Sequence, residues 1–290
     1  MELIEKILCE ENLQKAIRKV KKNKGAPGVD KMTVQEVEEW FNQYKEELIS
    51  KILNKQYKPM PVKRVYIPKP NGKQRPLGIP TVVDRVIQQA MLQVLNEIYE
   101  PVFSEHSYGF RPNRSAHMAM EEVLGYLNDG YEWIVDLDIE KFFDTVNHDK
   151  LISILRERVN DSKTLHLIRA YLQAGVLDKG LVRSSTVGTP QGGPISVILS
   201  NIYLDKFDKE LESRNLCFSR YADYTEVETM PKLSLKHRRY QGFLLIISAY
   251  FFYYKRYRRS KVSGLLQLFI PLSGLTVSIA FARTSNVANA

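Results

Sequence analysis

Acidic residues are absent from the C-terminal end of this 290-residue chain, since no Asp or Glu follows Glu228. Ten of the 42 Lys and Arg lie in residues 229–290, which leaves 32 basic against 33 acidic residues in 1–228. The formal net charge of +9 therefore belongs to the C-terminal stretch and does not indicate that the rest of the chain binds nucleic acid. A change of composition this abrupt favours an unrelated, out-of-frame C-terminus.

Cysteine is also scarce, because only Cys9 and Cys217 are present. Two cysteines cannot build a disulfide framework, which favours a reducing, cytoplasmic compartment. The chain lacks a secretory start, since its first five residues (MELIE) are acidic and mixed in character.

Of the two long apolar runs, 242–254 is too short to span a membrane and 264–282 is interrupted by polar residues and Pro271. Membrane insertion is thus a minor alternative.

A second stretch without acids, residues 51–83, carries eight Lys and Arg. Such a stretch attracts phosphate groups. A solvated basic surface is the alternative interpretation.

Apolar periodicity divides the chain into helices and strands, and its length allows a sizeable core and about two domains. Helices are predicted over 2–22, 33–53, 84–99, 148–159 and 196–214, after Ser115, and up to Leu172. Strands are predicted over 62–67, 131–137 and 216–221, with hairpin turns at 71–72 and 178–180.

Two carboxylates, Asp138 and Asp223, each come at the end of a strand-like run. Nucleotidyl transfer needs two or three carboxylates that converge on divalent metals about 3.5–4 Å apart, and hard oxygen ligands suit Mg²⁺. Asp138 taken alone could equally be a helix N-cap. After Asp223 a second Asp would strengthen the cluster, but the chain has Tyr224.

A loop rich in Gly and Pro, residues 188–196 (GTPQGGPIS), precedes the predicted helix 196–214. Glycines let a ligand approach the backbone closely, and free N–H groups at a helix start could meet a phosphate or a base. Taken alone, such a loop is usually only a turn.

Together these segments resemble a reverse transcriptase, specifically the reverse transcriptase and maturase encoded by group II introns. The resemblance covers roughly residues 15–223, and five ordered blocks at plausible spacing make it specific. The blocks are 24–30 (KGAPGVD), 66–80 (YIPKPNGKQRPLGIP), 107–112 (SYGFRP), 138–144 (DIEKFFD) and 189–192 (TPQG).

The resemblance implies a role for each matching position. Asp138, the backbone carbonyl of Ile139 and Asp223 would ligate two Mg²⁺ ions. Nucleotide-binding residues would be Lys69, Arg75, Phe143 and Gln191, with Phe143 as a steric gate against a ribose 2′-hydroxyl. Lys21, Lys22 and Lys24 would bind RNA. The implied partners are group II intron RNA, a template-primer and a dNTP.

The predicted fold is α+β, with right-hand polymerase fingers and a partial palm, an antiparallel sheet with helices, and no recognisable thumb. We expect a helical extension over 1–60, fingers over 61–130, partial palm over 131–228 and an unrelated, frameshifted tail over 229–290. The palm sheet should then end in an unpaired strand. Because one carboxylate is missing, polymerase activity should be impaired, and an intron RNA-binding maturase without polymerase activity is the alternative.

Overall fold

The protein is described by a computed structural model in which two compact units each combine two stretches of chain. The residues described are 2–68, 72, 74–131, 133–139, 142–183, 188, 192–229, 266–270 and 275–283. Unit 1 comprises Met1–Phe103 and Lys141–Leu204, and unit 2 comprises Ser104–Glu140 and Asp205–Ala290.

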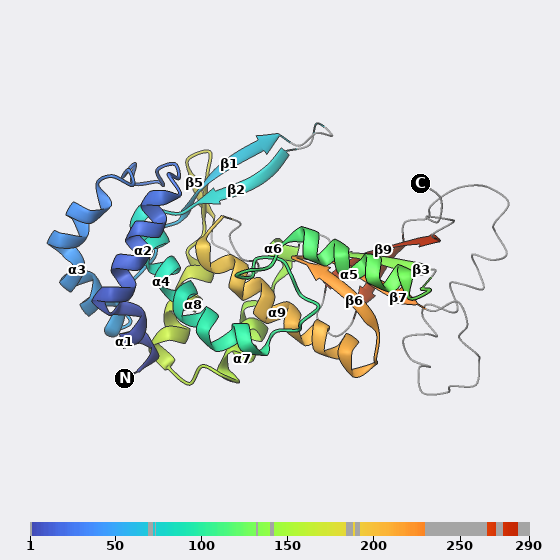
Figure 1. Ribbon diagram of the computed structural model, residues 1–290. Helices are drawn as coiled ribbons and strands as arrows, with labels where there is room; N and C mark the ends of the chain where they lie inside the picture. The colour runs from blue at the N-terminus through green and yellow to red at the C-terminus, as the bar shows by residue number, and fades with distance from the viewer. Residues whose placement is uncertain are drawn as a thin grey trace. The chain divides into compact units, whose positions relative to one another are not determined.

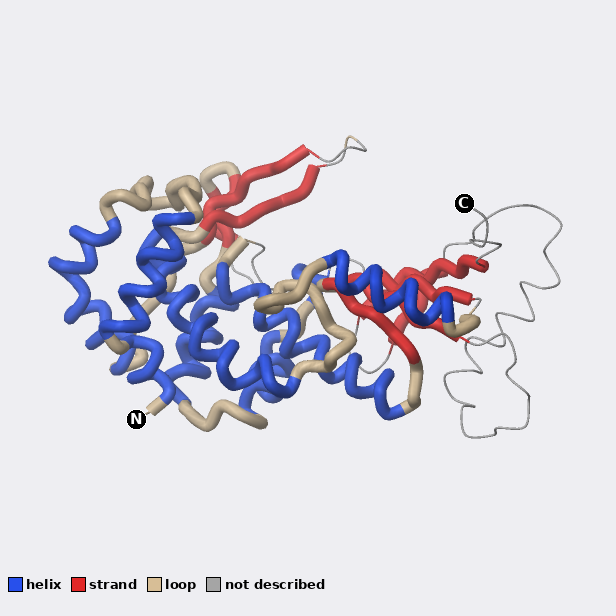
Figure 2. Tube along the Cα trace, viewed as in Figure 1, coloured by secondary structure: helices blue, strands red, loops and turns tan. Residues whose placement is uncertain are grey.

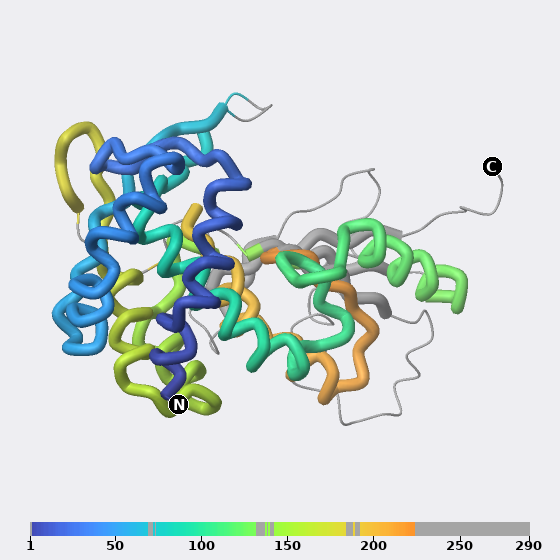
Figure 3. The backbone as a smooth tube through the Cα atoms, turned by 60° about the vertical axis from the view of Figure 1, so that its left-hand side comes forward, coloured from blue at the N-terminus to red at the C-terminus, as the bar shows by residue number. Residues whose placement is uncertain are grey.

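Unit 1 is mainly helical, and α4 is its central helix. The helices are α1 (Leu3–Leu8), α2 (Glu10–Lys22), α3 (Val37–Leu53), α4 (Val82–Tyr99), the short 3₁₀ helix η1 (Glu100–Val102), α6 (Phe142–Thr145), α7 (His148–Arg156), α8 (Ser162–Gln173) and the start of α9 (Pro194–Ser213). Helices α1 and α2 pack against α4 and remain beside it in two views (Figures 1 and 3). Most of α4 is buried, since Val86, Ile87, Ala90 and Met91 have no exposed surface.

A four-stranded sheet completes unit 1, in the order β2-β1-β4-β5. Its strands are β1 (Val62–Pro68), β2 (Gln74–Ile79), β4 (Val176–Asp178) and β5 (Leu181–Arg183). Strands β1 and β2 form an antiparallel hairpin from Lys63 paired with Ile79 to Pro68 paired with Gln74. This pairing confirms the hairpin predicted around Asn71-Gly72, although Asn71 lies outside the described residues.

Buried Asp84 links the base of this hairpin to the start of α4. Its carboxylate accepts hydrogen bonds from the hydroxyls of Tyr57 (2.6 Å) and Thr81 (2.7 Å) and from the backbone N–H of Met60 (3.3 Å). Burial nevertheless raises the pKa of Asp84. The donors around it satisfy a carboxylate that would otherwise be costly to bury.

Among its described residues, unit 2 forms a five-stranded sheet in the order β6-β7-β3-β9-β8, drawn red in Figure 2. All of its strand pairs are antiparallel. Its elements are α5 (Ala116–Asn128), β3 (Trp133–Ile139), the end of α9, β6 (Cys217–Tyr221), β7 (Tyr224–Thr229), β8 (Leu266–Ile270) and β9 (Leu275–Arg283). Helix α5 packs against β6, where the Ser219 hydroxyl donates to the carbonyl of Ala119 at 3.2 Å. Helices with an antiparallel sheet confirm the predicted α+β class.

Two expectations from the sequence were wrong in detail. The predicted helix 2–22 is interrupted at Cys9, whose backbone is extended, and the Asn12 side chain donates to the carbonyl of Ile7 at 2.8 Å across the break. The predicted unpaired strand edge is also absent at β3, because β9 pairs with it from Trp133 to Ile139. Whether 229–290 is a frameshifted tail stays a prediction.

The apolar stretch 264–282 contains β8 and most of β9 among its described residues. In the part of the chain that the structure describes, no helix is both long enough and apolar enough to cross a membrane.

Candidate functional site

Asp223 lies in the two-residue turn that joins β6 to β7, and it is half-buried. Tyr221 pairs with Tyr224 across the turn, so Ala222 and Asp223 are its two central residues. Ala222 has a φ of 62°, a conformation that favours glycine in tight hairpins and costs an alanine some strain. The turn therefore presents Asp223 at the end of the β6–β7 hairpin.

Asp138 lies on β3, the strand next to β7. The register pairs Asp138 with Tyr224, the residue directly after Asp223. Neighbouring strands are about 4.8 Å apart, so the backbones that carry the two aspartates lie within reach of one metal cluster. The expected placement of Asp138 and Asp223 at adjacent strands is thus present in the fold, while their role as ligands stays a prediction.

Glu226 and Glu228 follow Tyr224 along β7 and pair with Asp136 and Ile134. They lie two and four residues farther from Asp138, which corresponds to roughly 7 and 13 Å along a strand. Neither occupies position 224, directly after Asp223, where a second carboxylate would strengthen the cluster.

The two aspartates supply oxygen donors, the ligand type that Mg²⁺ prefers. Among the residues described, the Arg220 guanidinium near this turn forms its ion pair with Asp208. Within that part of the chain no group of three or more His, Cys, Asp or Glu could hold a metal. The donor chemistry therefore fits Mg²⁺, but the ligand set is smaller than a complete three-carboxylate cluster.

Two of the predicted nucleotide-binding residues, Phe143 and Arg75, lie on segments of unit 1 that approach glycines in and around the loop before α9. The first contact joins the loop before α9 to the segment of Phe143. Gly188 donates its N–H to the carbonyl of Val146 at 2.8 Å, and the ring of buried His148 forms a hydrogen bond with the carbonyl of Gly188 at 2.6 Å. A Cβ on Gly188 would lie 2.8 Å from the carbonyl oxygen of Phe143. The half-buried Phe143 of α6 thus lies beside the loop that carries Gln191.

The second contact joins this loop to β2, which carries the exposed Arg75. A Cβ on Gly192 would lie 2.3 Å from the carbonyl oxygen of Gly78 on β2, and one on Gly193 would lie 2.4 Å from the Gln88 side chain of α4. Only glycine allows this close approach. Lys69 and Gln191 themselves lie outside the described residues.

The predicted RNA-binding lysines lie at the end of α2. Lys22 and Lys24 are exposed, whereas Lys21 forms an ion pair with Glu38 at 2.8 Å. The loop that follows is fixed on α4, because Arg85 donates to the carbonyl of Ala26 at 2.8 Å. Lys22 and Lys24 are therefore the better placed of the three to contact a phosphate.

Sequence reasoning missed the residues that hold these segments in place, notably His148, Asp208 and Arg220. His148 stands directly after the N-cap Asn147, and Arg220 lies three residues before Asp223. The sequence shows these residues, but their partners lie elsewhere in the chain, so local patterns do not reveal their role.

Comparison with known proteins identifies the class. Residues 67–227 match the family described as reverse transcriptase (RNA-dependent DNA polymerase). The chain belongs to this reverse transcriptase family.

Its similarity to individual proteins extends the match. The chain is 41% identical over 220 residues to protein YkfC of Escherichia coli (strain K12), covering 74% of this chain and 58% of that protein. It is 42% identical over 182 residues to the group II intron-encoded protein LtrA of Lactococcus lactis subsp. cremoris, covering 61% of this chain and 30% of LtrA. The second similarity confirms the resemblance predicted from the sequence, and the chain spans less than two thirds of either relative.

A solved structure supports the fold alone. A chain of a partial Cas6-RT-Cas1–Cas2 complex matches with a TM-score of 0.53 and 24% identity, covering 79% of this chain and 38% of that one. This likeness agrees with the reverse transcriptase fold and carries no statement about partners.

Proposed function

We propose that this chain derives from an RNA-directed DNA polymerase of the group II intron class and that its polymerase activity is impaired. The observation that supports the proposal best is the register of β3 and β7, which pairs Asp138 with the residue next to Asp223. This register lies within the segment that matches the reverse transcriptase family.

In this proposal the carboxylates of Asp138 and Asp223 and the carbonyl of Ile139 would hold two Mg²⁺ ions. When bound, such ions lower the pKa of a hydroxyl and neutralise charge on a triphosphate. The oxygen of the primer 3′-hydroxyl forms a bond to the α-phosphorus of the dNTP. The bond from that phosphorus to pyrophosphate breaks, and the hydroxyl proton leaves to solvent.

The nucleotide-binding roles are assigned to residues of unit 1. Lys69 and Arg75 would contact the triphosphate, and the guanidinium of Arg75 can bind two phosphate oxygens at once. Phe143 would exclude a ribose 2′-hydroxyl, and Gln191 would lie near the bound nucleotide. The contacts of Gly188 and Gly192 support this grouping, since they join the Gln191 loop to the segments of Phe143 and Arg75.

Impairment follows from Tyr224, which replaces a carboxylate with a phenol at the position opposite Asp138. A missing carboxylate weakens metal binding and removes negative charge that would hold the cations through the transition state. Glu226 and Glu228 are too far along β7 to replace it.

Primer extension on a primed RNA template tests this function. We expect little or no extension by the natural chain in Mg²⁺, an increase with Tyr224→Asp, and no increase when Asp223→Asn is added to Tyr224→Asp. Extension by the unaltered chain at the level of an intact relative would contradict the impairment. Extension that survives Asp223→Asn would contradict the assignment of Asp223.

Binding of group II intron RNA is the alternative activity, and exposed Lys22 and Lys24 favour it. Changing both to Glu should weaken RNA retention in a filter-binding assay, because each reversal replaces phosphate attraction with repulsion. Lys15→Glu with Lys163→Glu makes the same charge change at lysines already paired with Glu11 and Glu2. Unchanged affinity of the Lys22 and Lys24 variant would refute this activity.

We also keep a cytoplasmic location as part of the proposal, on the basis of two free cysteines.

A further inference from the structure

The turn that carries Asp223 is held by the side chain of Arg220. The Arg220 Nη1 donates to the carbonyl of Ala222 at 2.7 Å. Ala222 is the strained residue of the turn, with its positive φ of 62°, and it directly precedes Asp223. A turn with an alanine in this conformation persists only where its surroundings determine it. Arg220 provides one such constraint.

The guanidinium of Arg220 is itself fixed on its other edges. Its Nε and Nη2 bind the two carboxylate oxygens of Asp208, each at 2.7 Å, and Nη2 also donates to the Ser107 hydroxyl at 2.7 Å. The side chains of Arg220 and Asp208 are 1% and 0% exposed. Asp208, on α9, thus anchors the Arg220 guanidinium that holds the turn.

The backbone of Arg220 is fixed by the segment Ser104–Arg114. Arg220 donates its N–H to the carbonyl of His106 and accepts from the N–H of Tyr108, both at 2.8 Å. Gly109 of the same segment lies against the turn, because a Cβ there would be 2.1 Å from the nitrogen of Ala222. The turn is therefore restrained from two sides.

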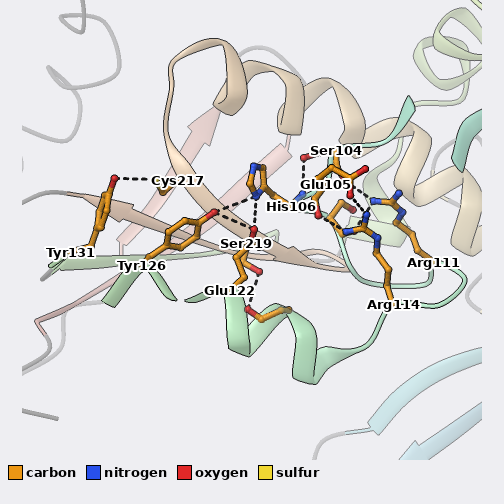
Figure 4. Close-up of polar contacts among 12 residues, drawn as sticks. Ser104, Glu105, His106, Arg111, Arg114, Glu122, Tyr126, Tyr131, Cys217 and Ser219 are labelled. Atoms are coloured by element: carbon orange, nitrogen blue, oxygen red, sulfur yellow. Dashed lines mark hydrogen bonds and ion pairs between the residues drawn. The ribbon is translucent and has the colours of Figure 1, made fainter. Parts of the chain in front are cut away.

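Figure 4 shows how this segment is braced. Buried Arg111 donates to the carbonyls of Ser104 and Ser107 at 2.5 and 2.7 Å, and Arg114 forms an ion pair with Glu105. The segment can therefore act as a fixed support rather than a loose loop.

We propose that Arg220, anchored by Asp208 and Ser107, is the positioning residue that sets the backbone of the Ala222-Asp223 turn and thereby aims Asp223 at the metal site. The planar fork of an arginine fixes several hydrogen-bond directions at once. For stability alone, a buried ion pair offers little over apolar side chains of the same volume. The metal-binding part of this inference rests on the proposed function, whereas the control of the turn does not.

The test compares Arg220→Lys with Arg85→Lys in the full chain. Lysine keeps the charge opposite Asp208 but cannot bind Asp208 at both oxygens and Ala222 together. Hydrogen–deuterium exchange by mass spectrometry over peptides that cover 217–225 should show exchange at the turn about tenfold faster in Arg220→Lys. The matched variant Arg85→Lys changes a buried arginine of unit 1 that donates to the carbonyl of Ala26, and it should leave exchange at the turn unchanged.

The second measurement is Mn²⁺ affinity, from the electron paramagnetic resonance signal of free Mn²⁺. Arg220→Lys should bind Mn²⁺ about tenfold more weakly, as expected when the support of a metal ligand is lost. Asp223→Asn defines the signal that belongs to this site. Should Arg220→Lys fail to fold, Arg220→Met with Asp208→Leu removes both charges together and should show the same faster exchange at the turn.

The outcomes separate the two claims. Unchanged exchange at the turn in Arg220→Lys, or equal acceleration in Arg85→Lys, overturns the positioning role. If the natural chain and Asp223→Asn bind the same amount of Mn²⁺, the metal site of the proposed function fails. Faster exchange at the turn in Arg220→Lys would still support the role of Arg220 in the geometry of the turn.

Discussion

Removing only one partner of the buried ion pair between Arg220 and Asp208 should strongly destabilise unit 2. Arg220→Met leaves the Asp208 carboxylate buried without its guanidinium, and Asp208→Leu leaves the guanidinium without its carboxylate. The double variant replaces both with apolar side chains of similar size. The two side chains are almost fully buried, so water cannot take over the missing interactions.

The expected magnitudes follow from burial and from the neighbouring charge. Removing one partner of a buried pair costs about 3–5 kcal/mol, whereas exchanging both for apolar residues is often neutral. The Asp205 carboxylate is also nearby, and burial followed by the charge of Asp208 raises its pKa. Arg220→Met removes a cation that offsets the repulsion between these two carboxylates, while Asp208→Leu leaves Arg220 to interact with Asp205. We therefore expect the loss of stability to be larger for Arg220→Met than for Asp208→Leu.

Urea unfolding followed by tryptophan fluorescence measures these differences. The chain has two tryptophans. Trp40 lies in α3 of unit 1 and Trp133 in β3 of unit 2, so a Trp40→Phe background makes the signal report unit 2. Single variants that each lose less than about 1 kcal/mol of unfolding free energy, or a double variant less stable than both singles, would refute this reasoning.

Two further changes test the supports of the site. Gly188→Ala should destabilise the protein by about 1–2 kcal/mol or more in urea unfolding. Gly188 has a φ of 89°, and the new Cβ would lie 2.8 and 2.9 Å from the carbonyl oxygens of Phe143 and Asp144. Unchanged stability would contradict this close approach. The hydrogen bond that the His106 ring donates to the Glu122 carboxylate raises the pKa of His106 above its ordinary value. The stability that this pair contributes is therefore full below about pH 6.5 and is lost as pH rises through the folded pKa. Glu122→Gln should therefore reduce the difference in melting temperature between pH 6 and pH 8, and an unchanged difference would count against the pair.

Local signals in the sequence predicted the elements that position the site. The Ser115 hydroxyl accepts from the N–H of Met118 and Asn147 accepts from Lys150, so both caps start helices where the pattern indicated. The carboxylate motifs also identified the strands, since β3 ends one residue after Asp138 and β6 ends two residues before Asp223. Capping and strand patterning depend on neighbours within a few residues, which is why they could be read from the sequence.

Features that depend on distant partners could not be predicted. The pairing of β9 with β3 joins segments more than 130 residues apart, and no local pattern specifies which strand will occupy a sheet edge. The same holds for Arg220, whose partners Ser107 and Asp208 come from two other elements. The start of α3 was also misplaced: Glu36 accepts from the N–H of Thr33 as a capping box would, yet the helix begins at Val37.

Cleavage of the backbone by bound Fe²⁺ tests most directly whether Asp138 and Asp223 form one metal site on neighbouring strands. With ascorbate and peroxide, Fe²⁺ bound in place of Mg²⁺ generates radicals that cut the nearest chain. We predict cuts near residue 138 and near residue 223 in the same sample, both suppressed by excess Mg²⁺ and both lost in Asp138→Asn and in Asp223→Asn. Cutting near only one of the two positions, or cutting near residue 223 that persists in Asp138→Asn, would contradict a shared site.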